Sequence, residues 1–394
     1  MIRRAGAAKL LMTTTIALAG GGTSSAADWS ETLDANSYLA YDRNPQLAAG
    51  SNVADRSAEL AVDGNTTRAT EVSQLTITPR ISITRYERDS NLDITTGSLA
   101  VSFVDNGERG QLSLAGQALT DSTLTSELGQ TGINSVNLRH DAYNATIGYL
   151  YSISERLSWL LQAGGQVTRY NSEAERYGLT SYNYDSLQLG PTWKFSDRLQ
   201  GSLVLEADRI APQSGQREKD YSASVQLKRA ITEKYSWRVS VGATRVDIPG
   251  SLGPPTSEVF ELGASSKTER IQWDLSARRA VLPIGLGLLA REDVATLTAS
   301  IAVSERSTLN LTANVIHTDP VSIFIYLAPE FAFQYQIYRG AAWGQATAEW
   351  QYHFSPTWML SAAYQQARAR NYSLTEWANG KQARLGIIWQ SSRL

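Results

Sequence analysis

The sequence has no cysteine among its 394 residues. Disulfide-stapled secreted scaffolds, Cys-ligated zinc folds and thiol catalysts are therefore excluded. Long apolar runs are also missing, because no segment after residue 27 reaches the roughly 18–20 consecutive apolar residues that a membrane helix needs. The richest run, residues 281–290, is short and includes Pro283 and two glycines. These absences exclude a helical membrane protein.

A strong net charge is missing too. The formal net charge is −2, Lys and Arg are scattered, and no block of five basic residues occurs, so electrostatics give no strong pull toward nucleic acid. The three histidines include no pair spaced for a metal, and no glycine-rich phosphate loop follows a strand. We therefore expect no nucleic-acid partner, no metal and no cofactor.

The N-terminal residues have the layout of a secretory signal. Arg3, Arg4 and Lys9 form a positive region, residues 10–19 are moderately apolar, and residues 25–27 are small. Cleavage after residue 27 would lower the formal net charge from −2 to −5, because it removes three positive residues and no negative one. We expect an exported chain that works in the periplasm, the outer membrane or the exterior of a Gram-negative cell.

Alternation of apolar and polar residues is the dominant pattern. From residue 295 to 303 the odd-numbered residues are apolar and the even-numbered ones mostly polar. Successive side chains of a strand point to opposite faces, so this pattern predicts a strand with one apolar face. The same alternation recurs at 157–168, 187–195, 271–276, 346–354 and 383–390.

A short turn phrase recurs between these strands. It has Ser or Thr, then an acidic and a basic residue, as in Ser154-Glu155-Arg156, and a hydroxyl at this position can bond a nearby backbone amide. Copies begin at 154, 196, 232, 268 and 304, with an altered copy at 355. The other connections are longer and polar, at 171–180, 210–220, 246–258, 318–343 and 369–381.

Alternating short and long connections are typical of a transmembrane β-barrel. We predict an all-β, antiparallel barrel over residues 28–394, with short periplasmic turns near 64, 106, 154, 196, 232, 268, 304 and 355 and long extracellular loops. Adding a first strand at 29–42 and a last one at 382–391 gives eighteen strands, and sixteen remain possible because 71–86 could be one strand or two.

A soluble β-sandwich or solenoid is the alternative fold. In a sandwich the apolar strand faces would pack against another sheet, and large inward aromatics would dominate. The sequence instead has 18 Tyr and 10 Trp against 7 Phe. Many of them, such as Trp159, Trp193 and Trp350, lie near strand ends beside the short turns, as in the aromatic girdle of a membrane barrel. This placement favours the barrel.

The inward strand faces are polar and carry both signs of charge. Sixteen to eighteen strands leave an aqueous lumen, so we predict that these residues line a hydrated pore. The alternative is that they only solvate the interior and pair with one another. The candidate pore-lining residues are Glu206, Asp208, Lys228, Arg238, Glu261, Lys267, Asp274, Arg278, Glu349 and Arg384.

Residues 321–338 are rich in aromatics where a loop should be polar. One interpretation is a loop folded into the pore whose rings stack on sugars. The other, which we favour from the sequence, is one or two further barrel strands with Pro329 at a bend. The candidate stacking residues are Phe324, Tyr326, Phe331, Phe333, Tyr335 and Tyr338.

Catalysis has weak support in the sequence. His353 and Ser355 are two residues apart, but a nucleophile needs its base within hydrogen-bond reach and a third group to orient that base, and no such group can be named. The spacing of His317 and Asp319 is equally common. We therefore expect no enzyme activity and no catalytic residues.

From about residue 92 onward the chain resembles a poorly characterised family of Gram-negative outer-membrane β-barrel porins, often encoded beside exopolysaccharide genes. The resemblance rests on segments 121–128, 131–132, 139 and 149–156, with 85–86 and 89–91 before them. It implies a role in exporting or retaining extracellular polysaccharide, and no enzyme activity. Residues 58–80 look compressed against the family pattern, and residues 391–394 lack the final Phe common in such barrels.

Three functions stay open at this point. The leading hypothesis is a channel that passes polysaccharide outward or small hydrophilic solutes by diffusion. The second is a plugged structural barrel whose external loops retain polysaccharide, and the third is an outer-membrane hydrolase that uses His353 and Ser355. The expected partners are outer-membrane lipid, polysaccharide and periplasmic export components.

Overall fold

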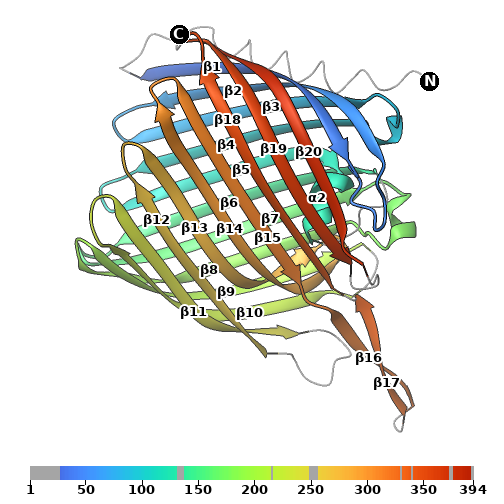
Figure 1. The fold of residues 1–394 in the computed structure, drawn as a ribbon. Coiled ribbons are helices and arrows are strands. Elements are labelled where there is room, and N and C mark those ends of the chain that lie inside the picture. The colour runs from blue at the N-terminus through green and yellow to red at the C-terminus, as the bar shows by residue number, and fades with distance from the viewer. Residues whose placement is uncertain are drawn as a thin grey trace.

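Eighteen strands form one closed antiparallel β-barrel in the computed structural model (Figure 1). The structure describes residues 27–130, 137–213, 216–247, 256–328, 331–338, 340–371 and 376–391, so the expected export signal at 1–27 lies almost wholly outside the described residues. The sheet closes because β1 (Asp28–Arg43) pairs with β20 (Ala378–Gln390) on one side and with β2 (Ala54–Ala69) on the other. The predicted fold class and the count of eighteen are confirmed.

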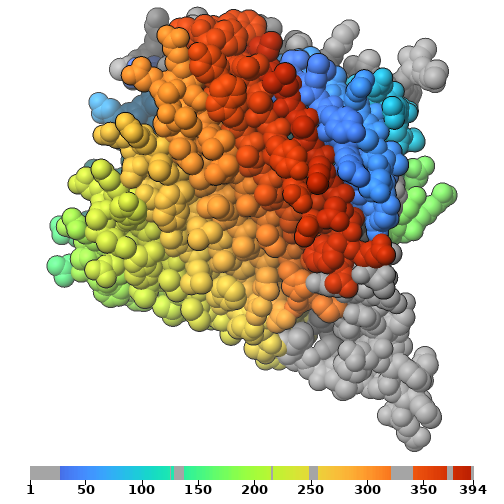
Figure 2. Space-filling view, viewed as in Figure 1, coloured from blue at the N-terminus to red at the C-terminus, as the bar shows by residue number. Residues whose placement is uncertain are grey.

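Consecutive strands pair around the barrel, and β15 pairs with β18. In Figure 2 the blue first strands lie directly beside the red last ones, which is the closure seen from outside. The remaining barrel strands are β3 (Ser73–Tyr86), β4 (Ile94–Asn106), β5 (Gly110–Ser122), β6 (Arg139–Ser152), β7 (Leu157–Tyr170), β8 (Tyr182–Ser196), β9 (Leu199–Pro212), β10 (Glu218–Ala230), β11 (Tyr235–Asp247), β12 (Thr256–Lys267), β13 (Ile271–Ile284), β14 (Leu288–Ser304), β15 (Ser307–Thr318), β18 (Ala341–His353) and β19 (Trp358–Asn371).

Short turns join the strands at one end of the barrel, called here the short-turn end. The hydroxyl of the repeated phrase shapes them: Ser154 Oγ accepts hydrogen bonds from the amides of Arg156 at 3.3 Å and Leu157 at 3.1 Å. Ser196, Thr232 and Ser355 accept in the same way. The hydroxyl therefore supplies the turn bonds that the sequence pattern predicts.

The first predicted turn is wrong. Residue 64 lies inside β2, and the turn between β2 and β3 occupies residues 70–72, where Thr70 Oγ1 accepts from the Ser73 amide at 2.9 Å. Gly64 is needed for a different reason, since a Cβ there would lie 3.1 Å from the Pro79 ring of the neighbouring strand. Residues 73–86 form the single strand β3.

Longer connections lie at the opposite end, called here the loop end. Two expectations fail there. The link between β13 and β14 is only residues 285–287, so connection lengths do not alternate strictly. The segment 321–338 forms β16 (Val321–Ala328) and β17 (Phe331–Tyr338), which pair with each other in a separate two-stranded sheet rather than joining the barrel. Figure 1 shows this hairpin beyond the barrel end.

The outer wall carries the apolar strand faces. Leu39 is 70% exposed and Val241 61% exposed, and Trp159, Trp193 and Trp358 are exposed beside the short turns. Such a surface is far more apolar than water-soluble proteins usually show. Among the described residues no helix is both long enough and apolar enough to cross a membrane.

Candidate functional site

The lumen is the candidate site, and the strand register fixes which residues face it. Asp34, Asn36, Tyr38 and Arg384 line an interior cavity of about 380 Å³, so the even-numbered residues of β1 and β20 point inward. Because facing residues of paired strands share a side, the register carries this assignment around the barrel. It places every candidate pore-lining residue on the lumen face, namely Glu206, Asp208, Lys228, Arg238, Glu261, Lys267, Asp274, Arg278, Glu349 and Arg384.

Opposite charges pair across neighbouring strands in the middle of the lumen. Arg238 of β11 lies 2.6 Å from Glu261 of β12 and 3.7 Å from Asp274 of β13. The three side chains are about two-fifths to one-half exposed, so water screens the pairs while their donors and acceptors still face the lumen. The sequence named all three residues but could not give their partners.

A second charged group lies on the far wall. Arg384 of β20 is 4.0 Å from Glu349 of β18, and its guanidinium stacks 4.9 Å from the Tyr38 ring centroid. Arg80 of β3 lies 3.2 Å from Asp63 of β2. Sequence reasoning missed Arg80 and Asp63 because the register of the first strands was ambiguous, although both follow the inward parity once β2 is one strand.

Acidic side chains gather at the loop end of β9, β10 and β14. Asp208, Glu218, Asp220 and Glu292 are all buried. The Glu218 carboxylate accepts a hydrogen bond from the Leu289 amide at 2.7 Å, and Asp220 accepts from the Thr244 hydroxyl. The sequence identified only Asp208 of these four, because its composition predicts a long connection at 210–220, which contains Glu218 and Asp220, and Glu292 precedes the alternating run that begins at residue 295.

The helix α2 (Thr123–Gln130) lies inside the barrel mouth. It belongs to the connection between β5 and β6 but contacts β15 and β18 on the opposite wall. Its Thr123 and Glu127 are almost fully buried. A short amphiphilic segment inside a barrel narrows the path between the two ends, so α2 forms a constriction.

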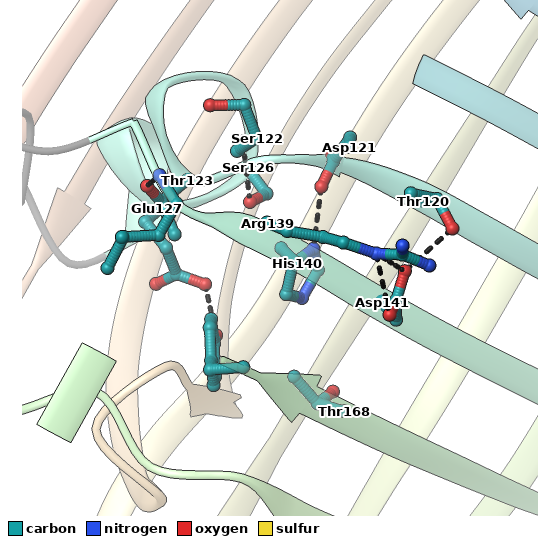
Figure 3. A network of polar contacts seen from close by, with 12 residues as sticks. Thr120, Asp121, Ser122, Thr123, Ser126, Glu127, Arg139, His140, Asp141 and Thr168 are labelled. Carbon is teal, nitrogen blue, oxygen red and sulfur yellow. Dashed lines mark hydrogen bonds and ion pairs between the residues drawn. The ribbon is translucent and has the colours of Figure 1, made fainter. Parts of the chain in front are cut away.

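Hydrogen bonds from β7 and from the residue before β6 hold α2 in this position, and a neighbouring pair links β5 to β6 (Figure 3). Tyr170 of β7 donates its hydroxyl to Glu127, and Thr123 Oγ1 accepts from the Leu138 amide at 3.1 Å. His140 Nδ1 lies 2.7 Å from Asp121 Oδ1, and the His140 and Tyr170 rings are 5.1 Å apart. Because each of these side chains faces inward, the network ties the helix to the wall from which it leaves.

The turn between β13 and β14 also folds inward. Its Gly285 carbonyl accepts from the Thr180 amide at 2.9 Å, and Leu289 packs with Tyr182, Ile210 and Val246. The apolar run 281–290, the richest in the sequence, thus contributes buried packing across the mouth. It covers the loop ends of β8 to β11. The remaining open space in the mouth lies on the opposite side.

That open space is a cavity of about 540 Å³ between α2 and the wall of β1, β15 and β18–β20. We call it the α2 cavity. Carboxamides and two aromatic rings line much of it: Asn314, Gln345, Gln365, Gln382, Tyr86 and Trp343. No sequence pattern predicts this site, because its lining comes from seven strands (β1, β3, β4, β15, β18, β19 and β20), the helix α2 and the connections after β1 and β3.

The catalytic candidates are not brought together. His353 lines the 380 Å³ lumen cavity, whereas Ser355 Oγ accepts hydrogen bonds from the Thr357 and Trp358 amides and so shapes a turn. His317 Nε2 lies 3.1 Å from Asp319 on the outer side. Within the ranges that the structure describes, no group of three His, Cys, Asp or Glu side chains could hold a metal ion. The side chains of the stacking candidates at 324–338 lie outside the described residues.

Comparisons with known proteins find remote structural likeness and no sequence relative. No family model matches, and no curated protein matches the sequence. Among solved structures, Pseudomonas aeruginosa OccK5 (OpdH) is 9% identical with a TM-score of 0.46, covering 93% of this chain and 98% of its own. Acinetobacter baumannii OccAB3 is 8% identical with a TM-score of 0.43, covering 93% and 100%. The FrpB iron transporter from Neisseria meningitidis is 8% identical with a TM-score of 0.46, covering 92% and 81%.

Proposed function

We propose that this protein is an outer-membrane channel of a Gram-negative cell that passes hydrophilic solutes through its lumen. The observation that carries the proposal is a closed 18-stranded sheet with an apolar outside and charged residues inside. Closure satisfies the backbone groups that lipid cannot hydrogen-bond, and a barrel of this size encloses an aqueous space. In such barrels short turns face the periplasm and long loops face outward, which orients the chain.

The charges suit small, water-soluble cargo. Ion pairs such as Arg238 with Glu261 put donors and acceptors along the path. Hydroxyl, amide and charged groups can replace part of a solute's hydration as it passes a constriction. The apolar outer face contacts outer-membrane lipid, and this contact holds the barrel in the membrane.

We also propose a more specific cargo, exopolysaccharide or its fragments, with periplasmic export components as partners. Its support is the family resemblance, together with the uncharged polar groups of the α2 cavity. The second candidate function is a plugged barrel that retains polysaccharide at its outer surface. It is favoured by one observation, that α2 and residues 285–287 both fold into the mouth.

Planar-bilayer recording separates the two candidates. Purified protein should produce stepwise ion conductance if α2 leaves an open path, and no steps if the mouth is sealed. A variant with Ile284→Ser and Leu289→Ser should loosen the apolar packing across the mouth and raise the conductance of an open barrel. Silence of the wild type in membranes where folded protein is demonstrably inserted would contradict the channel and favour the plugged barrel.

A further inference from the structure

The α2 cavity has a lining that is more specific than a general pore requires. Asn314 and Gln345 face each other across β15 and β18, and Gln365 faces Gln382 across β19 and β20. Each carboxamide offers two donors and one acceptor oxygen without any charge. Neighbouring strands thus present two pairs of carboxamides toward one cavity.

Asp42 is the charged residue of the inward register that lines the cavity, and its carboxylate oxygens already accept hydrogen bonds. Asp42 accepts from the Gln382 amide at 2.6 Å and from the Ser57 hydroxyl at 2.9 Å. Lys381 and Arg43 touch the cavity rim but belong to the outward register of β20 and β1. An anionic ligand would therefore find no counter-ion on the inward register here, whereas a neutral polar ligand would find the carboxamides.

Trp343 supplies the most direct sign of a ligand. Its ring lines the cavity, and its indole Nε1 is buried with no hydrogen-bond partner among the described residues. Leaving a buried donor without an acceptor is unfavourable, so a small turn of the ring that brings this nitrogen, closed to solvent in the free protein, to a ligand hydroxyl would favour binding. Tyr86 lies on the same cavity and adds a second ring for apolar contact with a ligand's C–H groups.

We propose that the α2 cavity is a recognition subsite for a neutral, polyhydroxylated solute, a short stretch of uncharged saccharide. The inference rests on the proposed channel and gives that channel a preferred cargo class. The volume of about 540 Å³ lies within the usual range of small-ligand pockets, roughly 300–1,000 Å³, and so admits one or a few sugar rings. Sugar hydroxyls can hydrogen-bond to the carboxamides, and the faces of sugar rings can pack against Trp343 and Tyr86.

Calorimetric titration of the detergent-solubilised barrel with maltotriose tests the subsite. Binding is expected for the wild type. Trp343→Phe keeps the ring but removes the indole donor, and Gln345→Leu keeps the volume but removes the amide, so each should raise the dissociation constant about tenfold. Gln188→Leu removes a lumen carboxamide on β8, away from the cavity, and should leave binding unchanged.

Several results would overturn the proposal. The first is no heat of maltotriose binding with the wild-type protein. The others are binding weakened by Gln188→Leu as much as by the cavity variants, binding unaffected by Trp343→Phe, and equally tight binding of a trimer of uronic acid. Retained heat-modifiable migration on a gel shows that each variant is folded. Calorimetry needs no ion flow, so maltotriose binding with a silent bilayer would refute the channel and keep the subsite. Conductance without maltotriose binding would refute the subsite and keep the channel.

Discussion

The ion pair of Arg238 with Glu261 affects the charge of the lumen more than the folding stability of the barrel. Its partners are 42% and 40% exposed, so its contribution to folding is about 0–1 kcal/mol. We predict that Arg238→Gln changes the urea midpoint of the barrel little but increases the preference for cations, because Glu261 and Asp274 lose their shared counter-ion. The measurement is the reversal potential across a salt gradient.

The matched control for that variant is Arg245→Gln. Arg245 lies on the same strand but in the outward register, so it should not alter the reversal potential. An unchanged ion preference in Arg238→Gln, or a shift toward anions, would show that this side chain does not face the conducting path.

Gly190 marks a place where two strands approach too closely for a side chain. A Cβ at this position would lie 1.8 Å from the Leu203 carbonyl oxygen of β9. We predict that Gly190→Ala destabilises the barrel by about 1–3 kcal/mol, the usual cost of overpacking. Gly165→Ala, whose Cβ would meet nothing closer than 4.0 Å, is the control. Equal urea midpoints for the two variants would contradict this reading.

At the scale of elements, the repeated turns were predictable and the inward elements were not. Ser154 and its equivalents act through hydrogen bonds within four residues, so their sequence phrase is sufficient. The position of α2 depends on Tyr170 of β7 and on Leu138, just before β6, which both come later in the chain. The turn predicted near residue 64 is wrong because the contact of Gly64 with Pro79 is visible only across paired strands.

The absence of cysteine makes the placement of α2 directly testable. We predict that Ser126→Cys, on the lumen side of α2, reacts with a charged, water-soluble thiol reagent and that the reaction lowers conductance. Leu297→Cys lies on the outer face of β14 and should stay unreactive in lipid. A reaction at residue 126 that leaves the current unchanged would place α2 away from the conducting path.

At the scale of the whole molecule, the alternation of apolar and polar residues predicted most of the lumen-facing residues but not the constriction formed by α2. Glu206 and Arg384 could be placed inward because alternation is a local property, once a closed barrel is accepted. The α2 cavity forms because α2 lies against the opposite wall of the barrel, so that Ser126 and Gln345 line one space. No residue spacing in the chain encodes this arrangement. Its carboxamides therefore looked like ordinary polar strand residues.

The distribution of charge over the lumen leads to a prediction for the intact channel. Acidic residues outnumber basic ones on the inward register and gather at the loop end, whereas Lys194, Lys228 and Lys267 lie near the short-turn end. The inward acidic residues are Asp34, Asp42, Asp55, Glu59, Asp63, Asp121, Glu206, Asp208, Glu218, Asp220, Glu261, Asp274, Glu292 and Glu349.

An acidic path concentrates cations, so we predict potassium-over-chloride selectivity. Mobile ions screen exposed charges over about 10 Å at 0.1 M salt and about 3 Å at 1 M, so selectivity should fall as salt rises. Reversal potentials at the two salt concentrations measure this directly. Because the cluster of acids lies at the loop end and the three lysines lie near the short-turn end, the open channel should also rectify, carrying unequal currents at opposite voltages of equal size. Anion preference at low salt would mean that ions do not follow the register-defined lumen.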